Sequence, residues 1–306
     1  MVLLQNDHPH APVTNPLLVK EGKDSIQIDT GPLKVEISRN HANLFQQIQI
    51  GHETILQAGA RDGPFLHSAP VPYAQRFRGA RWNTHGWKKE QTVSRVDVPE
   101  ALHQGVLLPA HRIEVETAGP MRTTLVLRGR YRPTGGTKLP QGLSWNFTTR
   151  LHFYRGHPFV HVEHAVENSS DERPQWVMPF LETGLRHSLT LEPVAIATLG
   201  VRKPAKDREN LEQAVALFPG ESATFLQLKR KKKEDHPRIL VHTPGKETVP
   251  MEGEVLFADI SDGNKGITVT LRYLAGKAPR QITLSSQELE VKLHAPPREN
   301  ARPWEL

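Results

Sequence analysis

The chain has 306 residues, of which 37% are hydrophobic and 24% are charged, and it contains 25 Pro, 22 Gly and no Cys. The absence of Cys excludes disulfides, thiolate metal sites and cysteine nucleophiles. The formal net charge of +6 is compatible with nucleic acid, an acidic polysaccharide or an anionic surface as a partner, and does not choose among them.

The length allows two domains of ordinary size or a single large all-β domain. Short apolar runs separated by Pro and Gly favour many strands joined by turns, so the predicted fold class is all-β. Residues 205–216 are the single stretch in which a helix is expected.

Residues 1–24 are predicted to be an extended lead-in. The first residues lack a cationic start followed by an apolar run, and no stretch of about 18 apolar residues occurs anywhere. These patterns predict a soluble protein with no export signal and no membrane span, cytoplasmic if this N-terminus is native.

Residues 25–133 are predicted to form a small β-barrel-like domain. Alternating runs flank the turn at 30–32, and a second hairpin is expected across 51–53. Further strands are predicted at 92–98, 112–117 and 122–131, where apolar and polar side chains alternate with a period of two.

A Pro- and Gly-rich stretch at 132–140 is the predicted boundary, followed by an antiparallel β-sandwich over 140–296 and a tail over 297–306. The basic run at 229–233 precedes Glu234 and Asp235 and is interpreted as a solvated hairpin loop. The turn at 259–266 lacks the calcium-loop spacing and is interpreted as a hairpin favoured by its Asp-Gly pair.

Several segments together resemble the exo-rhamnogalacturonan lyase family in their order and spacing. These segments are residues 26–37, 116–122, 127–129, 150–154 and 257–267. The resemblance implies an N-terminal β-barrel, a central β-sandwich and a C-terminal α/α toroid with which lyase chemistry is chiefly associated. Because the chain ends at Leu306 without repeated helical patterns, we expect the usual catalytic toroid to be absent.

The long segment at 61–89 is the candidate ligand-binding region, since loops of this length commonly carry function. Its predicted substrate-binding residues combine guanidinium groups, which grip carboxylates, with indole rings, which cover the apolar faces of sugars. They are Arg76, Arg81, Trp82, His85 and Trp87. The alternative is that the two tryptophans anchor the loop while the arginines stay solvated.

A second cluster contains His152, His157, His161, Glu163 and His164. On a strand, His161 and Glu163 share a face, a spacing that suits a metal site. A third ligand cannot be located from the sequence, and an ordinary strand with a polar outer face explains the pattern if His164 packs inward. No metal and no other cofactor is therefore predicted, and the catalytic residues are not assigned.

The leading functional hypothesis is a carbohydrate-related β module that binds or positions an acidic, pectin-type glycan resembling rhamnogalacturonan, with a separate catalytic subunit as a further partner. One alternative is a complete polysaccharide lyase with its site between the two β domains. The other is a basic nucleic-acid-binding β protein, which the lack of aromatic residues interleaved with Lys and Arg along successive strands disfavours.

Overall fold

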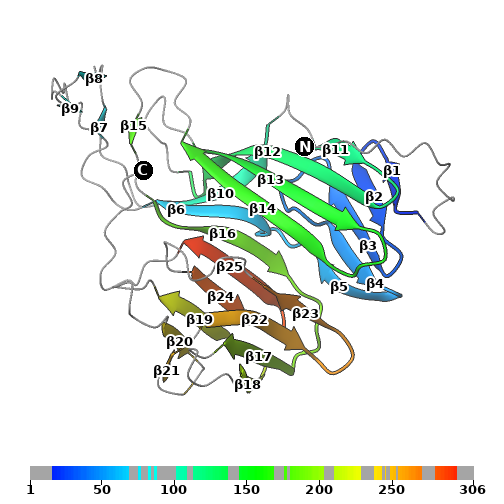
Figure 1. The fold of residues 1–306 in the computed structure, drawn as a ribbon, viewed down its shortest axis with the longest axis vertical. Coiled ribbons are helices and arrows are strands. Elements are labelled where there is room, and N and C mark those ends of the chain that lie inside the picture. Colours follow the sequence, from blue (N-terminus) through cyan, green and yellow to red (C-terminus); the bar gives the residue numbers. More distant parts are fainter. Residues whose placement is uncertain are drawn as a thin grey trace, which may run out of the picture.

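A computed structural model gives the fold of the chain (Figure 1). It describes residues 16–68, 75–76, 82–83, 86–87, 101–108, 113–136, 145–168, 176–177, 180–202, 210–228, 238–242, 245, 249–252, 254–270 and 280–294. All the regular elements among these residues are strands, so the all-β class is confirmed.

The largest sheet has twelve antiparallel strands and runs through the whole molecule (Figure 1). Along the sheet its strands are β14 (Val160–Asn168), β13 (Trp145–Tyr154), β12 (Arg122–Pro133), β10 (Ala101–Leu107), β6 (Gly63–Ser68), β16 (Phe180–Ser188), β25 (Glu288–His294), β24 (Arg280–Leu284), β19 (Ala223–Leu228), β20 (Arg238–His242) and β21 (Val249–Glu252), with β11 (Glu114–Ala118) paired to β12.

Two smaller sheets cover different ends of this large sheet. The first is a five-stranded meander of β1 (Leu18–Glu21), β2 (Ser25–Asp29), β3 (Leu33–Ser38), β4 (Gln47–Ile50) and β5 (Glu53–Gln57). The second contains β18 (Asn210–Leu217), β17 (Ala195–Arg202), β22 (Glu254–Ser261) and β23 (Gly266–Val269). Two short ladders join β15 (Trp176–Val177) to β7 (Gln75–Arg76) and β8 (Trp82–Asn83) to β9 (Gly86–Trp87).

Each smaller sheet closes a hydrophobic core against the large one. The meander packs on β12 and β13, where buried Ile26, Ile28, Leu125 and Leu151 belong to one cluster. The four-stranded sheet packs on β19, β24 and β25 in a separate cluster that includes Leu199. The molecule thus contains two sandwiches that share one continuous sheet.

Alternation of side chains determines which residues enter these cores. In β3, Leu33, Val35 and Ile37 are buried, while Lys34 and Glu36 between them are not. The same alternation holds in β13, which has an apolar inner face and a largely polar outer face. This outer face carries the candidate site described below.

The predicted helix at 205–216 is wrong where the structure describes it. Residues 210–217 form β18, which pairs with β17 over eight residue pairs, from Arg202↔Asn210 to Ala195↔Leu217. Buried Val215 and Leu217 alternate with exposed neighbours, so pairing and burial override a locally helix-compatible composition.

The hairpin turn predicted at 259–266 is confirmed. It joins β22 to β23, with Gly263 at a φ of 92°, and the Asp262 carboxylate accepts hydrogen bonds from the backbone N–H groups of Asn264 and Lys265. The basic run at 229–233 lies outside the described residues.

The predicted boundary at 132–140 falls between β12 and β13, which are neighbours in the large sheet over nine residue pairs from Arg122↔Tyr154 to Arg130↔Asn146. The division into domains over 25–133 and 140–296 stays a prediction. Among the described residues, no helix is long and apolar enough to cross a membrane.

Candidate functional site

The outer face of β12, β13 and β14 carries a group of polar and aromatic side chains at the end where β13 turns into β14. This outer-face site consists of Arg122, His152, Tyr154, Phe159, His161 and Glu163. Side chains alternate between the two faces of a strand. The site residues therefore share the outer face, while their strand neighbours Leu151, Phe153 and Val162 point toward the core.

One part of the site combines a cation with exposed aromatic surface. The Arg122 guanidinium lies 5.7 Å from the centre of the Tyr154 ring, which itself lies 5.5 Å from the centre of the Phe159 ring. Phe159 is 49% exposed, and Arg122 is also exposed. A guanidinium beside ring faces can hold a carboxylate while the rings cover apolar C–H surface.

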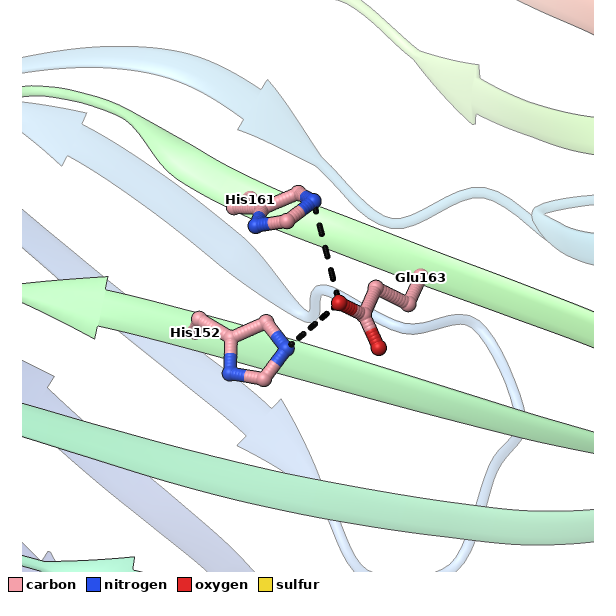
Figure 2. A group of neighbouring side chains, drawn as sticks. All are labelled: His152, His161 and Glu163. Carbon is pink, nitrogen blue, oxygen red and sulfur yellow. Dashed lines mark ion pairs between the residues drawn. The ribbon is translucent and has the colours of Figure 1, made fainter. Parts of the chain in front are cut away.

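The other part of the site contains two imidazoles and a carboxylate (Figure 2). Cross-strand pairing places His152 of β13 directly opposite His161 of β14, with ring centres 5.2 Å apart. Glu163 Oε1 lies 3.5 Å from Nε2 of His152 and 4.0 Å from Nε2 of His161. His152 is buried, whereas the other two side chains reach solvent.

Contacts with the neighbouring strand β12 fix the orientation of the His152 ring. Its Nδ1 lies 2.9 Å from Thr124 Oγ1 and 2.9 Å from Nη2 of Arg122. A guanidinium only donates hydrogen bonds, so this arrangement favours a neutral ring whose proton is on Nε2. Burial lowers the pKa of His152; Glu163 opposes this shift and Arg122 reinforces it.

Ion pairs occupy the outer face beside the site. Arg150 of β13 contacts Glu116 at 3.1 Å, and Arg128 of β12 contacts Glu114 at 2.6 Å. The hydrogen bond from Arg150 is the main reason that the pKa of the Glu116 carboxyl is lowered. Arg150 and Arg128 are thus paired with carboxylates, whereas Arg122 lies against an aromatic ring and an imidazole.

His164 is not part of the outer-face site, because it packs inward as the alternative for this strand required. Its Nε2 lies 2.9 Å from the Tyr131 hydroxyl, and its Nδ1 lies 2.8 Å from Thr149 Oγ1. Burial lowers the pKa of His164 to about 4. His157 is exposed in the turn between β13 and β14 and is not a member of the imidazole–carboxylate group.

The predicted loop site is described only in part. Trp82 and Trp87 are Cα partners in the β8–β9 ladder, and Arg76 pairs with Trp176 between β7 and β15. Arg81 and His85 lie outside the described residues. Figure 1 places β8 and β9 far from the β13–β14 turn, so the described part of the predicted loop site and the outer-face site are two separate candidates.

Comparison with known protein families identifies one that matches most of this chain. A family profile described as the PcRGLX-like protein central beta sandwich domain matches residues 17–218. The chain belongs to this PcRGLX-like family. The rhamnogalacturonan lyase-like resemblance is therefore confirmed at the level of a β-sandwich region. No curated protein matches the chain.

The match to the PcRGLX-like sandwich includes β12, β13 and β14, and therefore the whole outer-face site. Sequence reasoning grouped His152 with His161 and Glu163 but did not locate it as the third member of their face, and it missed Arg122. The missing information is strand register, which aligns Arg122 with Tyr154 and His152 with His161. A register assigned from the hydrophobic alternation of β12, β13 and β14 is the signal that would have found the site.

Proposed function

We propose that this carbohydrate-related β module binds an acidic, pectin-type glycan of the rhamnogalacturonan class at the outer-face site. The observation that carries the proposal is the exposed Arg122–Tyr154–Phe159 group, in which a cation adjoins two aromatic rings. The family supports a carbohydrate-related module, and the site supplies groups suited to an acidic sugar.

The chemistry of a uronate residue matches this group in two ways. A guanidinium can form paired hydrogen bonds to its carboxylate, which a neutral sugar lacks. The exposed Phe159 ring can cover the apolar C–H face of the same or the next sugar. Burial lowers the pKa of His152, which disfavours a second cation beside Arg122.

Calorimetric titration with acidic and neutral oligosaccharides of equal length tests the proposal. We expect the acidic oligosaccharide to bind more tightly, and Arg122→Met to remove most of that preference. Because Arg122 is exposed, its contribution should decrease as salt is raised. Phe159→Ala should weaken binding of both classes, since it removes apolar contact without changing charge.

Arg128→Met is the matched control, because Arg128 lies on the same face of β12 but is paired with Glu114. It should leave the preference for acidic glycan unchanged. Equal affinity for the two glycans in the native protein, or equal effects of the two arginine substitutions, would contradict the proposed site.

The predicted loop residues Arg76, Arg81, Trp82, His85 and Trp87 remain a second proposed contact region for the same glycan.

We assign cleavage to a separate catalytic partner, so the chain alone should release no unsaturated uronate product. Sustained product formation that is lost in Tyr154→Phe would instead support the alternative of a complete lyase.

A further inference from the structure

We propose that His152, His161 and Glu163 bind a divalent transition-metal ion of the zinc class. The three side chains come from two adjacent strands, and Figure 2 shows both imidazoles directed at one oxygen of the Glu163 carboxylate. Two imidazoles and a carboxylate form a ligand set that zinc and its neighbours in the first transition row accept. The inference does not depend on glycan binding.

The spacing of the ligand atoms is close to what such an ion needs. With metal–ligand bonds of about 2.0–2.1 Å, two ligands of a tetrahedral ion lie roughly 3.3–3.4 Å apart. The distance from His152 Nε2 to Glu163 Oε1 is 3.5 Å, and that from His161 Nε2 is 4.0 Å. All three ligand atoms lie within 4.8 Å of one another. The His161 and Glu163 side chains both reach solvent, so rotation of these side chains can shorten the longer distances.

His152 provides an independent reason to expect a ligand here. Its Nε2 is buried and has no partner of ordinary hydrogen-bond geometry, because the Glu163 carboxylate toward which it points is a long contact at 3.5 Å. A buried ring nitrogen normally has a partner, because leaving it without one costs free energy. Thr124, whose Oγ1 is 2.9 Å from Nδ1, can accept the Nδ1 proton and orient the ring, as outer-shell groups do for metal-bound histidines.

The position of Arg122 determines whether His152 can bind a metal ion through Nε2. Its contact with His152 Nδ1 favours a proton on Nε2, yet a metal must bind Nε2 through its lone pair. Metal binding therefore requires the other tautomer, with Nδ1–H donating to Thr124 and the Arg122 guanidinium displaced from Nδ1. Arg122 is exposed, so this displacement does not disturb the core. The arginine and the metal ion thus compete at His152.

The proposed ion has three protein ligands, so a fourth position remains for water or a ligand oxygen. Exposure of His161 and Glu163 places that position at the outer face, beside Arg122 and Tyr154. Open positions of this kind distinguish ligand-binding metal sites from closed structural ones.

The experiment titrates chelator-stripped protein with Zn²⁺ by calorimetry and uses Co²⁺ absorption to report the coordination geometry. We expect one equivalent of tight binding and a cobalt spectrum of four- or five-coordinate type. His161→Gln and Glu163→Gln should each weaken binding by at least about tenfold, as loss of a ligand does. His161 is half-buried at the surface and Glu163 is exposed, so both variants should fold, which circular dichroism checks.

Two controls separate this site from the other histidines of the chain. His52→Gln removes an exposed turn histidine elsewhere and should leave the zinc affinity unchanged. Arg122→Met should tighten binding several-fold, since it removes the competing cation, while Arg128→Met should not. The proposal is overturned if His161→Gln and Glu163→Gln bind zinc like the native protein, or if Arg122→Met binds it no more tightly.

Discussion

Gly129 in β12 is a position where any side chain would collide with the core. A Cβ atom there would lie 2.1 Å from Cζ of Phe147, its cross-strand partner, and 2.5 Å from the carbonyl oxygen of Val106. Gly105 on the next strand is similarly close to the same ring, at 2.9 Å from its Cε1. The two glycines make room for the buried Phe147 ring to lie across two strands.

Gly129→Ala should therefore destabilise the protein by about 2 kcal/mol or more, because overpacking a core forces side chains or backbone to shift. Urea unfolding measures the change. In Gly119→Ala the nearest atom is Arg122 O at 3.3 Å, so this control should have a much smaller effect. Gly129→Ala should cost less in a Phe147→Leu background than in the native protein, and an equal cost in the two backgrounds would contradict contact with the Phe147 ring as its cause.

At the scale of elements, local patterns predict strands well where burial follows chain alternation. Leu33 and Val35 are buried and alternate with the more exposed Lys34 and Glu36, and the run predicted after the turn at 30–32 corresponds to β3. The helix prediction at 205–216 misses β18 because pairing with β17 is nonlocal information that the composition of this stretch does not contain. Prediction of the site had the same limit, since His152 meets His161 only through register.

The loop elements β8 and β9 carry Trp82 and Trp87, whereas Arg81 of the predicted loop site lies outside the described residues. If this segment contacts the glycan, Trp82→Ala should weaken binding through loss of ring contact, and Arg81→Ala should weaken it more at low than at high salt. Titration calorimetry with the acidic oligosaccharide measures both. Unchanged affinity in folded variants would assign these residues to anchoring the loop and leave the outer-face site as the proposed contact.

At the scale of the whole molecule, one continuous sheet supports two separate cores. Strand β10 of this sheet contains His103, which is fully buried, with Nε2 3.1 Å from Ser68 Oγ and its ring 5.1 Å from that of Trp145. Burial, reinforced by the nearby His67, lowers the pKa of His103 to about 4. This histidine is therefore neutral in the folded protein near pH 7.

The lowered pKa of His103 predicts that the folded protein loses stability in acid. The unfolded chain takes up the proton near the ordinary pKa of 6.5, whereas the folded state resists it until about pH 4. The contribution of His103 is thus complete above pH 6.5 and is lost as pH falls from 6.5 to 4, by roughly 3 kcal/mol in total. His103→Phe should flatten this part of the stability profile, measured by urea unfolding at a series of pH values. An unchanged slope would contradict the assignment.

The most direct test of the central claim is hydrogen exchange, with and without an acidic pectin-type oligosaccharide. The outer-face site predicts slower exchange in peptides that cover residues 152–163, where β13 turns into β14, and no change in peptides of β22 and β23 around the distant core. Protection restricted to residues outside β12, β13 and β14, or no protection at saturating oligosaccharide, would contradict the claim that this face binds the glycan.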